Sequence, residues 1–197
     1  MADDDTRPAL APDYPIATER LLLRPIDPVG DIAAMHAYRS REDVCRYIPP
    51  VPVTREQLAA TYADPERSRS VLTESGQILA LAIVLRETGR LVGDIILIWS
   101  KEHPSNGEVG YIVDPEHQGR GYATEAVRAV LGLGFDGLGL HRVVGRIDAR
   151  NPASGRVLTK AGMRQEAVLV ENEWFKGEWG TEVDFAILER EWRALQG

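Results

Sequence analysis

The segment from Glu108 to Ala126 restricts the possible folds more than any other part of the chain. It reads Glu-Val-Gly-Tyr-Ile-Val-Asp-Pro-Glu-His-Gln-Gly-Arg-Gly-Tyr-Ala-Thr-Glu-Ala, which predicts a strand, a loop begun by a proline, a glycine turn and a helix. Gly119 and Gly121 allow backbone N–H groups to converge, because no Cβ atom intervenes. Such groups at the positive end of a helix bind anions, so the segment predicts a pyrophosphate cradle to which Arg120 adds charge. The alternative is a helix entered through a glycine turn that binds nothing.

Apolar runs and amphipathic segments alternate along the rest of the chain, which predicts one α/β (α+β) domain with a mixed sheet. We expect strands at 20–25, 78–85, 91–99, 108–113, 143–147, 165–170 and 182–188, and helices at 31–38, from 54 onward, 122–135 and 153–160. This order predicts about six to seven strands flanked by about four helices. The domain is expected over residues 16–197. The Asp- and Pro-rich residues 1–15 are expected to be a disordered tail.

Composition excludes several classes of function. The 197 residues hold 23 Lys and Arg against 30 Asp and Glu, a formal charge of −7, which argues against nucleic acid or an anionic membrane as partner. The longest apolar run, Ile78 to Leu85, is too short to cross a bilayer, and the acidic N-terminus is unlike a signal peptide. One cysteine and four scattered histidines predict a cytoplasmic protein without a metal site.

A second polar motif follows the strand expected at 143–147. It reads Asp148-Ala-Arg-Asn-Pro-Ala-Ser154 and precedes an amphipathic helix. Asn151 directly before a helix, with Ser154 three residues later, is first of all an N-cap pattern. The strand that precedes it is expected beside the strand that begins at Glu108. Both polar side chains would then face the same cleft as the glycine loop.

With these two signals in place, the chain resembles the GCN5-related N-acetyltransferases, specifically the ribosomal-protein N-terminal acetyltransferase type (RimJ/RimL-like). The resemblance runs from about residue 18 to residue 192. It rests on six motifs in order: Thr18-Glu-Arg-Leu-Leu-Leu-Arg-Pro25, Gly110-Tyr-Ile-Val-Asp-Pro115, Gln118-Gly-Arg-Gly-Tyr-Ala-Thr-Glu-Ala126, Asn151-Pro-Ala-Ser154, Lys160-Ala-Gly-Met163 and Glu191-Trp192.

The resemblance implies an acetyl-CoA site between two splayed parallel strands, 108–113 and 143–148, with a bulge in the first strand that frees backbone groups for the pantetheine arm. It implies that Asn151 contacts the pantetheine and that Ser154 donates a proton to the departing thiolate. The implied cofactor-binding residues are Tyr111, Ile112, Val113, Gln118, Gly119, Arg120, Gly121, Tyr122, Ala123, Thr124, Asn151 and Ser154. Many relatives use a tyrosine as the acid, but the helix after Asn151 holds none.

The implied reaction is direct attack of a neutral amine on the thioester, which requires a base and a donor for the developing oxyanion. At pH 7 roughly 10% of an α-amine but only about 0.04% of a lysine side chain is neutral, so an α-amine needs only a weak base. Glu108 and Glu173 are the candidate bases, Glu173 slightly favoured because members of this type carry a catalytic glutamate in that region. Each has the alternative of being an ordinary solvated carboxylate.

The leading hypothesis is therefore an acetyl-CoA-dependent N-acetyltransferase that acts on a protein N-terminal α-amine. The alternatives are acetylation of a small-molecule amine, such as an antibiotic or metabolite, and a non-catalytic acetyl-CoA sensor. A peptide acceptor predicts an open groove, and a small molecule predicts a closed pocket. A homodimer is expected only from the resemblance.

Several other features carry less weight. Gly132 to Gly137 spells G-x-G-x-x-G, but it follows a helix instead of opening one, so close packing or a weak helix end is the better interpretation. Core packing explains the aromatic residues Trp174, Phe175, Trp179 and Trp192 at least as well as an acceptor pocket does. Cys45 is expected to be a buried thiol, and His117 either to contact an anion or to be exposed.

Overall fold

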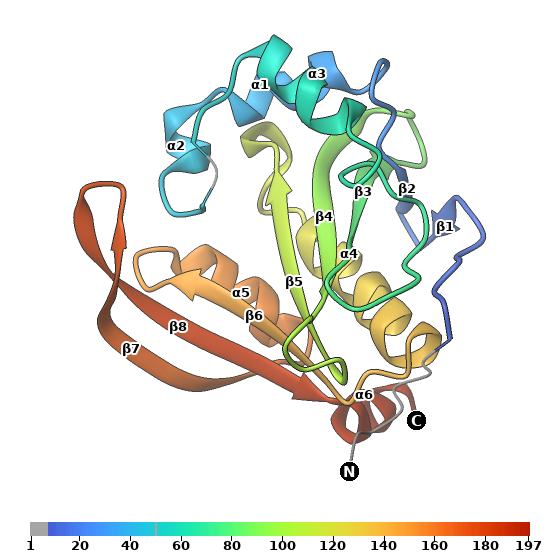
Figure 1. Ribbon diagram of the computed structural model, residues 1–197, viewed down its shortest axis with the longest axis vertical. Helices are drawn as coiled ribbons and strands as arrows, with labels where there is room; N and C mark the ends of the chain where they lie inside the picture. Colours follow the sequence, from blue (N-terminus) through green and yellow to red (C-terminus); the bar gives the residue numbers. More distant parts are fainter. Residues whose placement is uncertain (1–7, 50) are drawn as a thin grey trace.

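The structure, a computed structural model, describes residues 8–49 and 51–197 and contains one mixed sheet (Figure 1). In this part of the chain the sheet order is β1-β2-β3-β4-β5-β6-β8-β7, and β5–β6 is the parallel pair. The strands are β1 (Ile16–Ala17), β2 (Leu21–Pro25), β3 (Ile78–Leu85), β4 (Leu91–Trp99), β5 (Asn106–Val113), β6 (Arg142–Asp148), β7 (Arg164–Phe175) and β8 (Glu178–Leu188). The predicted fold class is confirmed.

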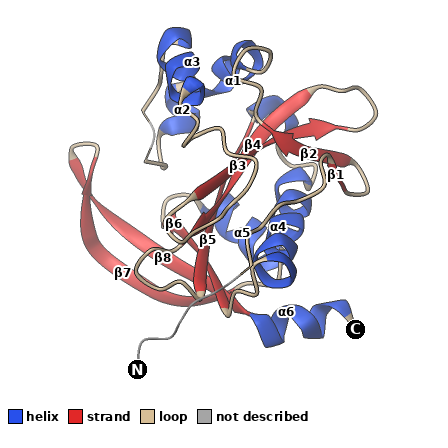
Figure 2. Ribbon diagram, turned by 45° about the vertical axis from the view of Figure 1, so that its right-hand side comes forward, coloured by secondary structure: helices blue, strands red, loops and turns tan. Residues whose placement is uncertain are grey.

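The helices lie on both faces of this sheet (Figure 2). In the described residues they are α1 (Ile32–Arg39), α2 (Glu42–Cys45), α3 (Arg55–Ala63), α4 (Tyr122–Gly132), α5 (Pro152–Lys160) and α6 (Glu189–Gln196). The expected numbers of six to seven strands and four helices were too low. The elements without a prediction are the short β1 and α2 and the C-terminal α6, too short or too polar to give a clear apolar period. None of the described helices is both long and apolar enough to cross a membrane.

Two apolar clusters hold the helices to the sheet. β3 is apolar at every position and is buried on both faces, as expected of a central strand. Its residues Leu79, Leu81 and Ile83 pack with α4, whereas Ala80, Ala82 and Val84 pack with α1 and α3. The sheet therefore separates a layer of α1 to α3 from a layer that contains α4.

Residues 1–15 were expected to be a disordered tail. Residues 8–15 are ordered, whereas residues 1–7 lie outside the described residues. Leu10 is buried and exchanges two backbone hydrogen bonds with Leu72, of 2.8 and 3.0 Å. A Cβ atom at Gly137 would lie 2.5 Å from Leu10 Cδ1. Close packing thus accounts for this glycine, which follows α4 in a π-helical turn, Leu133–Gly137.

The C-terminal part is a long hairpin of β7 and β8. The sequence predicted two shorter strands, at 165–170 and 182–188, with a chain reversal between them. β7 and β8 form a curved ribbon at the edge of the sheet (Figure 1). They meet in a two-residue turn, since Phe175 pairs with Glu178. A register shift between Leu169 and Glu173, with Glu171 at φ 50°, bends β7. Glu173, expected in the reversal, therefore lies on a strand.

Candidate active site

The parallel strands β5 and β6 separate after three residue pairs. They pair only from Asn106↔Arg142 to Glu108↔Val144, although both strands continue for several residues (Figure 1). The predicted splay is therefore present. The bulge expected in the first strand is absent: β5 pairs with β4 in unbroken register from Gly107 to Val113. The gap arises because β6 follows β8 away from β5.

Backbone groups of β5 point into this gap. Asp114 N–H donates to Val92, and Ser100 N–H donates to Asn106, so the even-numbered residues of β5 bond to β4. In an antiparallel pair the alternate residues face the other way. The odd-numbered groups of β5 therefore face β6. The last pair, Glu108↔Val144, uses the Val109 N–H, so the Val109 C=O and the N–H and C=O of Tyr111 are the groups that face the side where β6 has diverged. An extended ligand with amide groups can pair there as an added strand would.

The glycine loop lies between β5 and α4. Gly119 and Gly121 adopt φ values of 75° and 84°, which other residues rarely accept. Gly121 is the N-cap of α4 and supplies no side-chain acceptor, so the first-turn N–H groups are left for an external anion. Gln118 is turned inward, because its Nε2 donates to the Val113 carbonyl over 3.0 Å.

Arg20 and Glu125 form a hydrogen-bonded pair, the Arg20 brace, that fixes this loop and that could not be found from the sequence. Arg20 donates from Nη1 to the Arg120 carbonyl (2.9 Å) and from Nε to Glu125 Oε2 (2.7 Å). Glu125 Oε1 accepts from the Arg20 N–H (2.7 Å) and from Thr18 Oγ1 (2.6 Å), and these bonds lower the pKa of Glu125 against the opposing effect of burial. Both residues lie in motifs that the sequence showed, Thr-Glu-Arg and Ala-Thr-Glu-Ala. No sequence signal indicates that Arg20 and Glu125, 105 positions apart, are in contact.

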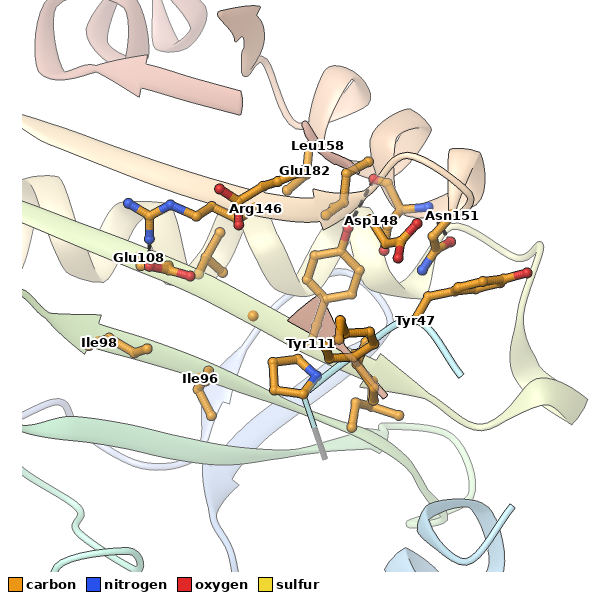
Figure 3. Close-up of a pocket in the computed structure, with 18 of the residues that line it drawn as sticks. Tyr47, Ile96, Ile98, Glu108, Tyr111, Arg146, Asp148, Asn151, Leu158 and Glu182 are labelled. Carbon is orange, nitrogen blue, oxygen red and sulfur yellow. Dashed lines mark hydrogen bonds and ion pairs between the residues drawn. The ribbon is translucent and has the colours of Figure 1, made fainter. Parts of the chain in front are cut away.

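A cavity of about 540 Å³ opens beside the splay, between the sheet, the segment after α2 and the β7–β8 ribbon (Figure 3). Six predicted site residues line it together: Glu108, Tyr111, Ile112, Asn151, Ser154 and Glu173. Val113 and the loop residues from Gln118 to Thr124 are not among its lining residues. The predicted residues thus fall into two groups, one around the cavity and one around the start of α4.

Glu108 lies at the point where β5 and β6 separate. It forms an ion pair with Arg146 on β6, and the two side chains point toward one another in Figure 3. Burial raises the pKa of Glu108, and Arg146 partly offsets this. A carboxylate whose pKa lies above the ordinary value accepts a proton more readily than an exposed glutamate does.

Asn151 and Ser154 lie at the start of α5. Asn151 Oδ1 accepts from the Ser154 N–H over 3.2 Å, so the capping interpretation is correct even though both residues also line the cavity. Tyr111 crosses from β5 and donates its hydroxyl to the Ser154 carbonyl over 3.0 Å (Figure 3). Burial raises the pKa of Tyr111 to about 12, so this phenol stays protonated.

The β7–β8 ribbon brings further carboxylates to the cavity. Glu173 and Glu182 both line it, and neither forms an ion pair with another described residue. Burial, together with the nearby Asp184 and Glu173, raises the pKa of Glu182. Sequence reasoning found Glu173 but missed Glu182, which was assigned to a strand without a function.

On the side of α1 the cavity is bounded by a buried charge network. Asp94, 2% exposed, accepts a hydrogen bond from the Tyr38 hydroxyl (2.6 Å) and from Arg39 Nε (3.1 Å). Arg39 also forms an ion pair with the same carboxylate. Asp94 and Arg39 line the cavity, so this network holds α1 against β4 at the site.

The remaining candidates lie mostly outside the cavity. Phe175 lines it, Trp192 stacks on Phe135 in the core at 6.0 Å, and Trp174 and Trp179 are exposed. Cys45 is a buried thiol, as expected, with its Sγ 3.4 Å from the Arg39 carbonyl.

His117 is buried and therefore not the exposed residue that was one of the two expectations. It groups with Asp114 and Glu116, and their ligand atoms lie within 4.8 Å of one another. Arg90 already approaches both carboxylates, Glu116 at 3.0 Å and Asp114 at 4.0 Å. The positive charge of Arg90 therefore offsets the negative charge of Asp114 and Glu116, which would otherwise attract a cation.

Diverging parallel strands, an uncapped helix start and an adjoining cavity are features that suit a protein that binds a long, phosphate-bearing ligand beside a second, smaller one. The family model for the acetyltransferase (GNAT) domain matches residues 20–164, and the chain belongs to this family. It is an acetyl-CoA-dependent N-acetyltransferase.

Three relatives show how far the likeness extends. The uncharacterized N-acetyltransferase YnaD of Bacillus subtilis is 33% identical over 90% of this chain and 98% of its own. A GNAT-family acetyltransferase from Bacillus anthracis has a TM-score of 0.77, 31% identity, and coverage of 88% and 98%. The spermidine N-acetyltransferase of Vibrio cholerae, solved with CoA and spermine, has a TM-score of 0.75 at 21% identity, with coverage of 89% and 99%.

Proposed function

We propose that this enzyme acetylates a small primary amine that carries more than one positive charge. The observation that carries the proposal is the charge of the cavity. Its described lining includes five carboxylates, Asp94, Glu108, Asp148, Glu173 and Glu182, against three guanidinium groups, Arg39, Arg67 and Arg146. The lining therefore favours cations over neutral or anionic acceptors.

The placement of these charges sharpens the argument. Arg39 is paired with Asp94, Arg146 with Glu108, and Asp148 with Arg150 from outside the lining. Among the described residues this leaves two carboxylates without an ion pair, Glu173 and Glu182, against one guanidinium group, Arg67. The pKa of Glu182 is raised because its charged form is desolvated and near other carboxylates. An ammonium group bound beside Glu182 relieves that repulsion and holds the carboxylate ionised.

The shape of the cavity also favours a small acceptor. Tyr47, Ile48 and Pro49, after α2, line it opposite Glu173 and Phe175 of β7. Hydrogen bonds from Lys176 at the tip of the ribbon to the carbonyls of Cys45 and Ile48 bridge one side of the cavity, where a peptide would need an open groove. The spermidine N-acetyltransferase of Vibrio cholerae, solved with CoA and spermine, is consistent with this choice. The RimJ/RimL-like subtype and a protein N-terminal acceptor remain predictions.

For the cosubstrate we propose the predicted backbone site. The residues fit a phosphate- and amide-bearing ligand, because the α4 N-terminus lacks a side-chain cap and β5 offers the Val109 C=O and the N–H and C=O of Tyr111 beyond its last pair with β6. Bound acetyl-CoA would supply an activated acetyl thioester. Gln118 to Thr124 would hold the pyrophosphate, and Tyr111, Ile112, Val113 and Asn151 would align the pantetheine arm, Ile112 through its side chain because its backbone pairs with β4.

For the proton transfers we propose Glu108, with Glu173 as the second candidate, and Ser154. An alkyl ammonium has a pKa of about 10.4, so a small amine needs a stronger base than an α-amine does. The partly buried Glu108 carboxylate, with its raised pKa, suits that task. Ser154 Oγ is the proposed proton donor to the departing sulfur.

The test is a comparison of acceptors with purified enzyme, following release of the CoA thiol with a thiol reagent. Background is small, since the chain's one cysteine, Cys45, is buried. We expect kcat/KM for spermidine and shorter diamines to exceed that for N-terminal peptides by at least tenfold. Glu182→Gln should lower kcat/KM for diamines more than for a monoamine of equal length. A preference for peptides would overturn the proposal in favour of the N-terminal acetyltransferase hypothesis.

A further inference from the structure

The tip of the β7–β8 ribbon is an unusual turn. Lys176 and Gly177 are its two central residues, with φ values of 50° and 89°. A two-residue hairpin turn with positive φ at both positions is a type I′ turn, in which Asn-Gly and Asp-Gly are strongly preferred. Lysine is a poor residue for the first position, because its Cβ atom disfavours this conformation. The turn itself therefore gives no reason for a lysine here.

The Lys176 side chain has a definite partner far along the chain. Its Nζ donates to the Ile48 carbonyl over 2.8 Å and also to the Cys45 carbonyl. Cys45 is the last residue of α2, and carbonyls at a helix C-terminus favour a cation. The ammonium thus joins the ribbon tip to residues 45–49, about 130 positions earlier.

A second contact reinforces the same junction. Arg150, which follows β6, forms ion pairs with Asp148 and with Glu178 next to the turn. Its guanidinium also lies 5.4 Å from the centre of the Tyr47 ring. Two cations from different elements therefore connect residues 45–49 to the start of β8.

The junction forms one wall of the cavity. Tyr47, Ile48 and Pro49 line the cavity on one side of it, and Glu173 and Phe175 line it on the other. Building on the proposed function, we infer that Lys176 is a specificity-determining residue: its ammonium fastens the ribbon tip to residues 45–49 and so restricts the acceptor to amines that fit inside the cavity. Lys176 acts on the size of the acceptor and takes no part in the proton transfers.

Lys176→Asn is a sharp test, because asparagine improves the turn while removing the ammonium. We expect an unchanged or higher melting temperature, an unchanged KM for acetyl-CoA and a kcat within twofold for small diamines. KM for those diamines should rise at least fivefold. The ratio of kcat/KM for long acceptors, such as peptides, to that for diamines should rise at least tenfold. Lys176→Arg, which can still reach both carbonyls, should restore most of the wild-type ratio.

Lys101→Asn is the matched control, since Lys101 is exposed and outside the cavity lining, and it should leave every constant unchanged. A wild-type enzyme that prefers small amines, and keeps the same preference in Lys176→Asn, overturns the inference alone. A wild-type enzyme that already prefers long peptides overturns the proposed function and this inference with it. The two failures are thus distinguished by the wild-type profile.

Discussion

Substituting each glycine of the loop before α4 by alanine tests whether the Arg20 brace supports the cosubstrate site. Gly119 and Gly121 both have φ near 80°, so Ala strains the backbone at either position by a similar amount. Their surroundings differ. A Cβ atom at Gly119 meets nothing within 4 Å, whereas one at Gly121 lies 3.3 Å from Arg20 Nη2. The pair therefore separates backbone strain from displacement of the arginine.

The expected magnitudes follow from these contacts. The left-handed conformation costs a non-glycine residue about 1–2 kcal/mol, which is the whole expected loss for Gly119→Ala. Displacing Arg20 also weakens its bond to the Arg120 carbonyl, about 0.5–1.5 kcal/mol for one hydrogen bond. Gly121→Ala should then lose about 1.5–3.5 kcal/mol in total. At roughly 2–4 °C per kcal/mol for a chain of this size, the melting temperatures should fall by about 2–8 °C and 3–14 °C.

The measurement is thermal or urea unfolding of both variants, each in the wild-type and the Arg20→Ala background. In the Arg20→Ala background the two substitutions should cost the same free energy of unfolding, because the contact that distinguishes them is gone. Calorimetric titration should show weaker acetyl-CoA binding in Arg20→Ala, by about 2–10-fold, with KM for the amine unchanged. The Arg20 brace would be refuted if Gly119→Ala and Gly121→Ala lost equal free energies of unfolding in the wild-type background, or if their difference persisted in Arg20→Ala.

Three further outcomes are expected. Ser154→Ala should lower kcat at least tenfold with little change in the Kd of acetyl-CoA; an unaltered rate would mean that another group protonates the sulfur. Burial raises the pKa of Glu108, and only its ionised form can act as the base. The value of kcat/KM should therefore increase as the pH rises through the raised pKa of Glu108, at a pH above the ordinary glutamate range. Glu108→Gln should abolish this increase. Asp94→Ala leaves Arg39 buried without its carboxylate, so we expect a loss of about 3–5 kcal/mol by urea unfolding; a loss below 1 kcal/mol would contradict the network.

The local structure of the proposed cosubstrate half was predictable because its signals are local. The glycine loop and the Asn-Pro-Ala-Ser motif each define a turn of known geometry within a few residues, and both lie where the sequence placed them. The splay was implied by resemblance, but its cause was not. The resemblance implied a bulge in β5, and the structure shows instead that β6 leaves β5 by pairing with β8. Pairing between distant strands leaves no local signal.

The acceptor half could not be predicted for the same physical reason. Glu182 becomes relevant only through the register of β8, and Arg146 only because β6 pairs with β5 at Glu108 before diverging. The junction of Lys176 with Ile48 depends on the length and bend of the ribbon, which in turn depend on a register shift in β7. Alternating patterns show which residues share a strand, but they do not show where two strands meet.

This contrast bears on how acceptors can differ within one fold. The proposed cosubstrate half is built largely from backbone groups, which survive most side-chain substitutions. The acceptor half is built from side chains on the segment after α2, on β5 and β6, and on the ribbon. Substitutions there change the charge and closure of the cavity without disturbing the cosubstrate site. Acceptor choice in this chain should therefore respond to changes at Lys176 and Glu182 while acetyl-CoA affinity stays constant.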